Sequence, residues 1–512
     1  MSESAVKRTL FSSAGIYTEY VIGMLVSIVI ARHLQPAGFG SYSVVIWMVA
    51  LGVVLTNSGT STAAIKFIAE LRGGQAPELI APMLTYLRRA QRWFLAAVLG
   101  VGTLGLWLAG DHVVPELHHG LLFGFLIVTV SVRSMYMFNI GIAKGFENFR
   151  ATAIVAAISA PLTLLMVALA GWLRAPIEAY LGIFVVSSLV LYCVSRAQIV
   201  PSIPPSAPGT RLPPELMSRV RRHMRLTAMT VTLGFLVGSE VEVLFLKLFA
   251  NEDAAGQFKV AFQLASGAAL LVPGVFGAIL LPLMANALKQ GSEVAAQRFV
   301  ASTRYLTLLA APLMAFGVVF APAIISALYG QAYAPAATAF AVCLVGGSLL
   351  TMTQGGSSLL VSADRQGSIL VLVSCLIVLK IVLNVVLVRL YGLSGAVYAY
   401  AAIMALDVVA LMVLAVRTSG VMPDWAALLR IGLAAAIGGL LAWPLLGQLN
   451  PFVSIVLGGL VVLLAYLPLS LLFNCWSRGD IEYMQQLHDR LGRRRSRFVQ
   501  AVLHRAYRRA HA

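Results

Sequence analysis

AAVLGVGTLGLWLAG, at residues 96–110, would be apolar on every side of a helix, and LAAAIGGLLAWPLL, at residues 433–446, has the same character. Fourteen such apolar stretches reach about 20 residues, the length at which a helix crosses the hydrocarbon of a bilayer. A transmembrane β-barrel would instead show segments of about ten residues with alternating polarity. The predicted fold class is therefore an all-α polytopic membrane protein with about 14 transmembrane helices.

The composition agrees with this class. Of 512 residues, 59% are hydrophobic and 11% are charged, whereas soluble domains carry about 25% charged residues. The first apolar stretch, VIGMLVSIVIARHL at residues 21–34, has no A-x-A-like cleavage site, so we expect it to be retained. The four cysteines show no CxxC spacing, so neither a disulfide framework nor a metal site is expected.

Lysine and arginine are distributed unequally between the two sides of the predicted bundle. Of 37 basic residues, 29 fall on the side of the N-terminus, five fall in the opposite loops and three lie inside spans. Because cytoplasmic loops retain positive charge, we expect both termini to be cytoplasmic. The charge of +17 is spread over alternate loops without a recognition motif, which argues against nucleic-acid binding.

The chain divides into two similar halves. We predict an N-terminal lobe at residues 1–200 with helices 1 to 6, a proline-rich and arginine-rich cytoplasmic linker at 201–225, and a C-terminal lobe at 226–417 with helices 7 to 12. Two further helices occupy residues 418–476. A basic cytoplasmic tail at 477–512 either lies on anionic headgroups or is solvated and partly disordered.

An internal repeat supports the two lobes. PAGFGSYSVV at residues 36–45 precedes the second span as DAAGQFKVAF at residues 253–262 precedes the eighth, so Gly40 corresponds to Gly256. GIAKGFENFR at residues 141–150 likewise corresponds to LLVSADRQGS at residues 359–368. Six spans per half give both halves one orientation, with a pseudo-two-fold axis along the membrane normal and a site at the midplane between the lobes.

Several motifs, in order along the chain, carry a family resemblance. They are ARHLQPAGFGSYS at 31–43 with NSGTSTAAIKFIAE at 57–70, the segment 242–288, ALYGQAYAPA at 327–336 and LNVVLVRLYGLSGAVYAYA at 383–401. Together they resemble the polysaccharide transporter, or oligosaccharide flippase, branch of the multidrug, oligosaccharidyl-lipid and polysaccharide exporter superfamily. Relative to that pattern, Glu242 holds the acidic position of the seventh helix, Lys66 replaces the usual arginine, and Phe39 and Phe258 stand where tyrosine is common.

The resemblance implies a function. Such a flippase moves undecaprenyl-pyrophosphate-linked oligosaccharide from the cytoplasmic to the periplasmic leaflet of a bacterial inner membrane, by alternating access, for cell-surface polysaccharide biosynthesis. The expected partners are membrane lipid and the polyprenyl-pyrophosphate-linked oligosaccharide, with polysaccharide polymerase or export proteins as further candidates. A monomer is expected, without a cofactor, and coupling to H⁺ or Na⁺ is open.

Ionisable residues near the centres of the spans are the first site candidates. A charge at this depth costs about 2.5 to 3.5 kcal/mol on insertion scales, so it normally faces a partner or a water-filled cavity. The candidates are Glu19, Arg133, Glu240, Glu242, Lys380 and Asp407.

Each candidate has a predicted role. Arg133 is the first choice for binding pyrophosphate, because its guanidinium fork donates hydrogen bonds in pairs; the alternative is an interhelical pairing with Glu19 or Glu240. Glu19, Glu242 and Glu240 are candidates for ion coupling or a gate. An unbroken helix would place Glu240 and Glu242 about 200° apart, so Glu242 is assigned to the cavity or its gate and Glu240 to a neighbouring helix.

A structural ion pair between Lys380 and Asp407, on consecutive helices, is preferred over a substrate contact for these two residues. Polar residues in the spans are candidates for hydrogen bonds to sugar or pyrophosphate, although such groups as often make interhelical contacts. In addition to the basic Lys66, they are Tyr17, Tyr20, Asn139, Gln263, Gln354 and Asn384.

No Walker sequence, glycine-rich phosphate loop or Ser/His/Asp order stands out, so we predict a protein that is not an enzyme. Two alternatives to the flippase stay open. One is a cation-coupled multidrug antiporter of the same superfamily, and the other is a non-transporting scaffold of a polysaccharide assembly complex.

Overall fold

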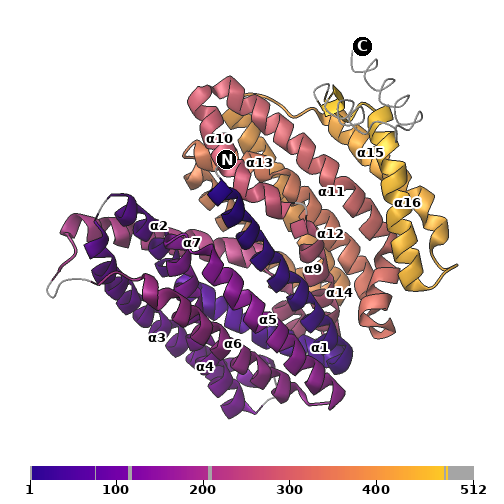
Figure 1. Ribbon diagram of the computed structural model, residues 1–512. Coiled ribbons are helices and arrows are strands. Elements are labelled where there is room, and N and C mark those ends of the chain that lie inside the picture. Colours follow the sequence, from indigo (N-terminus) through magenta and orange to yellow (C-terminus); the bar gives the residue numbers. More distant parts are fainter. Residues whose placement is uncertain are drawn as a thin grey trace. The chain divides into compact units, whose positions relative to one another are not determined.

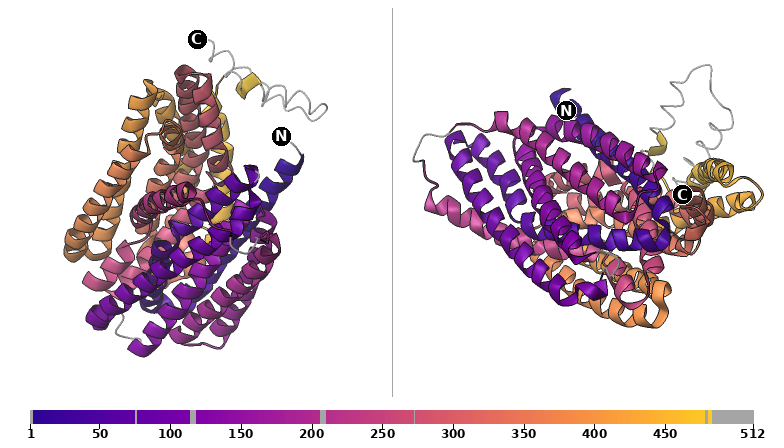
Figure 2. Two further views of the ribbon diagram at one scale, coloured as in Figure 1. Left: turned by 90° about the vertical axis from the view of Figure 1, so that its left-hand side faces the viewer. Right: turned by 90° about the horizontal axis from the view of Figure 1, so that it is seen from below.

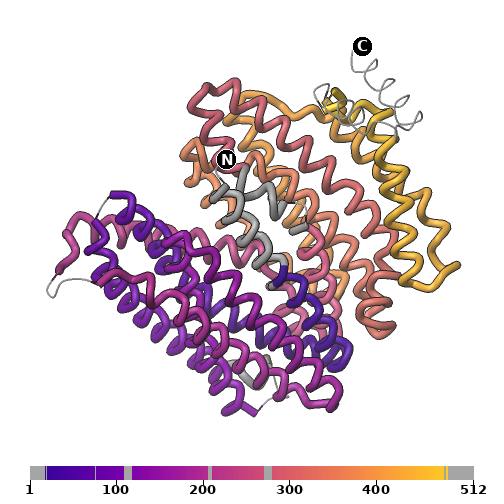
Figure 3. The backbone as a smooth tube through the Cα atoms, viewed as in Figure 1, coloured from indigo at the N-terminus to yellow at the C-terminus, as the bar shows by residue number. Residues whose placement is uncertain are grey.

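The computed structural model describes residues 3–74, 76–113, 118–205, 210–271, 273–477 and 480–482. Within these ranges the side chains of residues 3–17, 19, 109–113 and 270–279 are not described, and Figure 3 traces the backbone with such positions in grey. The predicted tail beyond residue 482 lies outside the described residues. Throughout the described ranges, the regular structure is helical, which confirms the predicted fold class.

Sixteen α-helices are described along the chain (Figure 1). They are α1 (Glu3–Asn57), α2 (Thr60–Gly73), α3 (Ile80–Val113), α4 (His119–Gly145), α5 (Phe149–Trp172), α6 (Ile177–Ile199), α7 (Pro214–Gly238), α8 (Glu242–Phe249), α9 (Glu252–Leu271), α10 (Pro273–Gln290), α11 (Ser292–Tyr329), α12 (Ala336–Met352), α13 (Gln354–Ser362), α14 (Gln366–Ser419), α15 (Trp425–Ala442) and α16 (Pro451–Leu472).

Nine helices in the described part of the chain are long and apolar enough to cross a membrane, or eleven if each of two bent pairs is one span. Two of the nine each contain a break and cover two predicted spans. In α1 the break is at Gln35 (φ 59°), just before Pro36, and in α14 it is at Gly392 (φ 55°). Proline cannot continue the hydrogen-bond ladder of a helix, which accounts for the first break. One of the fourteen apolar stretches, at residues 257–288, is covered by α9 and α10.

The chain forms two compact units. Residues 1–259 and 373–396 make the first unit, and residues 260–372 and 397–512 make the second. These units differ from the predicted lobes, because α7, α8 and part of α14 pack with the first six spans. The lobes themselves stay a prediction based on the internal repeat.

In the first unit, α1 packs along α5, and α4 packs along α6 and α2. Glycine allows a close approach of two helices in this unit, between the start of α9 and the turn of α1 after its break. A Cβ on Gly40 would lie 2.1 Å from the Glu252 carbonyl oxygen, and a Cβ on Gly256 would lie 2.0 Å from the Pro36 carbonyl oxygen. The contact is reciprocal, since each glycine meets the carbonyl four residues before the other.

In the second unit, α11, α15 and α16 pack against one another, as Figures 1 and 2 show for the yellow pair beside α11. Asp424 and Asn450 cap the starts of α15 and α16 with their side-chain oxygens. The Tyr466 hydroxyl of α16 donates to the Leu308 carbonyl at 2.8 Å, and Gly458 lies directly over the Phe320 ring. α15 and α16 therefore pack against α11, and a hydrogen bond joins α16 to it.

Candidate functional site

The stretch LVGSEVEVLFLKLF, at residues 236–249, does not form one helix. α7 ends at Gly238, Ser239 is extended (φ −89°, ψ 166°), and α8 begins at Glu242 after a bend of 57°. The seventh apolar stretch, at residues 226–249, predicts one unbroken span, and this prediction is wrong because the helix breaks at residues 239–241. The signal in the sequence was the adjacent Gly238 and Ser239, a pair at which helices often kink.

A break inside the membrane frees backbone carbonyls that must find donors, because lipid offers none. Lys380 of α14 supplies them. Its Nζ donates to the carbonyl oxygens of Val237 and Ser239, each at 2.8 Å. Trp47 of α1 adds a bond from its indole Nε1 to the Ser239 hydroxyl at 3.3 Å. Side chains of α1 and α14 therefore stabilise the break within the first unit.

The positive charge of Lys380 also neutralises the buried carboxylate of Glu242. Lys380 Nζ lies 3.2 Å from Glu242 Oε1, and both side chains are 0% exposed. The ammonium lies at the carboxyl end of α7 and the carboxylate at the amino end of α8, so both helix dipoles favour the pair. Both oxygens of Glu242 are buried, and neither has a hydrogen-bond partner among the described residues, so Oε1 meets Lys380 as an ion pair alone.

Glu240 lies in the break, outside both helices, and pairs with Lys259 of α9. Each of these side chains is 17% exposed, so this pair is less buried than the Glu242 pair. We call Glu240, Glu242, Lys259 and Lys380 the break cluster. Next to it, Lys247 Nζ donates to the Ser41 hydroxyl at 3.0 Å and pairs with Glu252.

The pair predicted between Lys380 and Asp407 is not the one that forms. The Lys380 ammonium donates to the carbonyls of Val237 and Ser239 and forms an ion pair with Glu242, all within the first unit. Asp407 is buried in the second unit and has no ion pair among the described residues. The break freed two carbonyls next to an acid, and this set holds a lysine better than a lone aspartate does.

Arg133 is half-buried on α4, with its guanidinium 4.3 Å from the centroid of the Phe184 ring of α6. A guanidinium over an aromatic face is held by a cation–π interaction. Its predicted contact with pyrophosphate stays a prediction. The side chains of Glu19 and Tyr17 lie outside the described residues, and Tyr20 is half-buried.

The remaining polar candidates are spread over several elements. Lys66 is exposed on α2, where its Nζ lies 5.3 Å from the Phe67 ring centroid. Asn139 is buried on α4 and donates to the Ser195 hydroxyl at 3.0 Å. Gln263 and Gln354 are half-buried in the second unit, and Asn384 is buried on α14 with its amide donating to the Lys380 carbonyl at 2.9 Å. Asn384 thus adjoins the break cluster through Lys380.

Lys247 and Lys259 were not identified from the sequence as candidate site residues, because they entered only the count of basic residues per loop. They are two of the five basic residues that the charge count places in the opposite loops, yet they pair with acids close in sequence, Glu252 and Glu240. The signal was the local balance of lysines and glutamates over residues 240–259.

Comparison with known proteins identifies the family of the chain. Residues 5–288 match the model of the family described as polysaccharide biosynthesis protein. No curated protein matches the chain.

Solved structures share the fold at low identity. The structure of the lipid II flippase MurJ in an inward closed conformation has a TM-score of 0.70 and 14% identity, covering 91% of this chain and 98% of that one. An inward-facing multidrug resistance MATE family transporter of the MOP superfamily has a TM-score of 0.63 and 13% identity, covering 78% and 93%. An outward-facing structure of such a transporter has a TM-score of 0.55 and 15% identity, covering 81% and 95%. The chain therefore has the fold of these transporters.

Proposed function

Because the chain belongs to the polysaccharide biosynthesis protein family, we propose that it is a flippase for undecaprenyl-pyrophosphate-linked oligosaccharide. It moves this lipid from the cytoplasmic to the periplasmic leaflet of a bacterial inner membrane, with both of its own termini cytoplasmic. Family membership is the observation that carries the proposal, since it joins a multi-pass transporter fold to polysaccharide biosynthesis. The likeness of fold to a lipid II flippase supports a lipid-linked substrate.

A buried cluster of charged side chains is consistent with the transport of a lipid-linked oligosaccharide. A pyrophosphate and its sugars cannot cross the hydrocarbon alone, so a flippase must offer polar groups at depth and alternate their access. In the proposed mechanism the break cluster links the transport cycle to charge movement. Glu242, with one oxygen 3.2 Å from Lys380 and neither oxygen hydrogen-bonded among the described residues, is the group that takes up H⁺ or Na⁺.

The leaflet in which the lipid-linked oligosaccharide is accessible tests the proposal. Cells that lack the chain should accumulate it in the cytoplasmic leaflet, and re-expression should return it to the periplasmic face. An unchanged leaflet distribution with and without the chain would refute the flippase. Drug sensitivity without a glycan defect would favour the multidrug antiporter, which the likeness to MATE transporters keeps as the second candidate.

The two glutamates of the break should differ in their effect on transport. We expect Glu242→Gln to lower the flipping rate at least about ten-fold, because it removes the carboxylate that pairs with a fully buried lysine. Glu240→Gln should have a smaller effect, because its pair with Lys259 is partly exposed. The measurement is the rate per folded molecule in proteoliposomes.

A matched control is Glu70→Gln. Glu70 pairs with Arg219 at 2.8 Å on the surface, with side chains 40% and 56% exposed, and exposed pairs contribute little. Its rate should equal that of the unmodified chain. If Glu240→Gln alone stopped transport, the roles assigned to the two glutamates would be reversed.

A further inference from the structure

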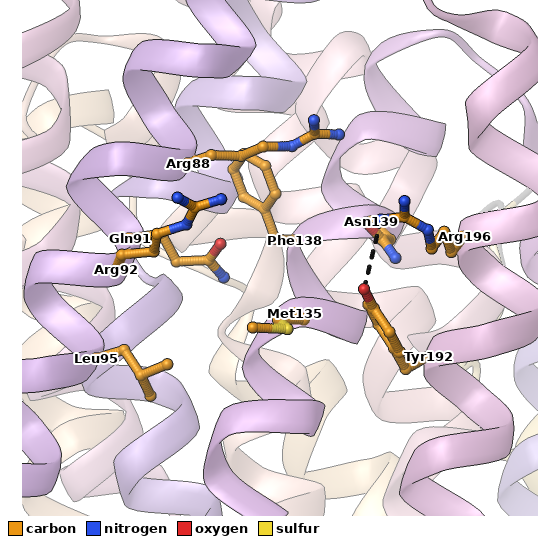
Figure 4. Close-up of a pocket in the computed structure, with 9 residues that line it drawn as sticks. All are labelled: Arg88, Gln91, Arg92, Leu95, Met135, Phe138, Asn139, Tyr192 and Arg196. Carbon is orange, nitrogen blue, oxygen red and sulfur yellow. Dashed lines mark hydrogen bonds between the residues drawn. The ribbon is translucent and has the colours of Figure 1, made fainter.

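Three arginines converge on a cavity that the break cluster does not use. The cavity, of about 150 Å³, lies in the first unit between α3, α4 and α6 (Figure 4). Arg88, Gln91, Arg92 and Leu95 line it from one face of α3, at the spacing of a helical stripe. Arg196 of α6 faces them from the other side, next to Tyr192.

The walls of this cavity are fixed by buried amides. Gln91 Nε2 donates to Asn57 Oδ1 and to the Ser134 carbonyl, both at 2.9 Å. Asn139 of α4 is held by its bond to Ser195. The arginines therefore project from rigid elements, and binding an anion there would order little additional structure.

The cavity carries positive charge that no acid balances. None of the nine lining residues is acidic, and no ion pair is recorded for Arg88, Arg92 or Arg196 among the described residues. Arg196 makes one long contact, 3.5 Å from its Nη1 to the Tyr192 hydroxyl. Clustered cations repel one another, so an anion that bridges them would be favoured, and the guanidinium fork matches phosphate oxygens.

A second, apolar groove lies further along α3 and α4. It has a volume of about 630 Å³ and is lined by α1, α3, α4 and α8, with Trp47, Val98, Gly102, Val130 and Leu244 among its residues. On α3 the step from Leu95 in the cavity to Val98 in the groove is about 4.5 Å along the axis. The cationic cavity and the apolar groove thus occupy successive stretches of α3 and of α4.

We propose that this cavity and groove bind the lipid-linked substrate before transport, with its diphosphate among Arg88, Arg92 and Arg196 and its polyprenyl chain in the groove. The inference rests on the proposed function for the identity of the substrate. A diphosphate carries more charge than the single phosphate of most phospholipids, so it matches three unpaired guanidinium groups better. Arg88, Arg92 and Arg196 also fall on the side predicted to be cytoplasmic, where such a lipid is made available.

The test is lipid binding to the purified full chain, measured by native mass spectrometry with undecaprenyl diphosphate and, separately, phosphatidylglycerol. Changing Arg88, Arg92 and Arg196 together to glutamine should weaken undecaprenyl diphosphate binding at least about ten-fold, because charge-assisted hydrogen bonds are lost. Arg89→Gln is the matched control, an exposed arginine on the same helix that does not line the cavity, and it should bind as the unmodified chain does.

The groove has its own matched pair of variants. A side chain at Gly102 would point into the groove, and a Cβ there meets nothing within 4 Å, as is also true of Gly100, which does not line it. Gly102→Leu should therefore reduce undecaprenyl diphosphate binding several-fold while Gly100→Leu leaves it unchanged. Size-exclusion elution checks that every variant is folded.

Three results would overturn the inference. They are undiminished undecaprenyl diphosphate binding in the triple variant, equal loss in Arg89→Gln, and phosphatidylglycerol binding as tightly with the same dependence on the arginines. The leaflet assay separates this inference from the proposed function. Arginine-dependent binding by a chain that does not flip the lipid would support the site and refute the flippase. Normal flipping by the triple variant would support the flippase and refute the site.

Discussion

Replacing Lys380 by methionine is expected to lower the free energy of unfolding by about 3 to 5 kcal/mol. The variant leaves Glu242 fully buried without its counter-charge, and it removes the Lys380 bonds to the carbonyls of Val237 and Ser239. Of these two carbonyls, only that of Ser239 keeps another backbone donor among the described residues, the Val241 N–H at 2.9 Å. Removing one partner of a buried pair costs more than the pair contributes, because the remaining charge stays desolvated. The measurement is denaturant unfolding of the purified protein in detergent.

Two further variants make this result specific. Lys144→Met removes an exposed lysine of the same unit and should change stability by less than about 0.5 kcal/mol. Combining Lys380→Met with Glu242→Gln should recover part of the loss, since the unpaired charge is removed as well. If the two single changes were simply additive, the pair would not be contributing and its assignment would fail.

Gly256→Ala should destabilise the chain by more than about 3 kcal/mol or prevent its folding, although alanine is the better helix former. The added Cβ would lie 2.0 Å from the Pro36 carbonyl oxygen and 3.1 Å from the Gly40 nitrogen. These are backbone atoms, so they cannot move aside as a flexible side chain can. α1 and α9 must separate, and the contacts around Ser41 and Lys247 would separate with them.

Gly182→Ala is the control for this change. Gly182 lies inside α6, and a Cβ there meets nothing within 4 Å, so the substitution should stabilise the helix by up to about 1 kcal/mol. Thermal unfolding in detergent measures both changes, the loss of stability in Gly256→Ala and the gain in Gly182→Ala. Equal stability of the two variants would show that the helices do not approach as closely as described.

Much of the fold could be predicted because hydropathy acts residue by residue. A stretch such as residues 96–110 must be a helix in lipid, whatever its neighbours, since no other structure satisfies its backbone there. Pro36 also marked its break in advance. The break at Ser239 has no proline, and it persists because Lys380, 141 positions away, supplies the missing donors.

The site was less predictable for the same reason. That Lys380, Glu240 and Glu242 lie at depth follows from their spans, but their pairing depends on which helices meet. Charge depth alone matched Lys380 with Asp407, a residue of similar depth on the next span, whereas packing joined it to Glu242. Arg88, Arg92 and Arg196 were read only as markers of the cytoplasmic side, since their convergence requires α3 and α6 to be neighbours of α4.

The reciprocal contact between Gly40 and Gly256 has a consequence for how such a chain can arise. Each glycine meets the carbonyl four residues before the other, which is the pattern of a self-complementary interface between identical subunits. A gene encoding only one half would make a chain whose glycine could meet a second copy of itself in the same way. Duplication and fusion of that gene would then preserve a contact that already existed, and the two glycines would descend from one ancestral position.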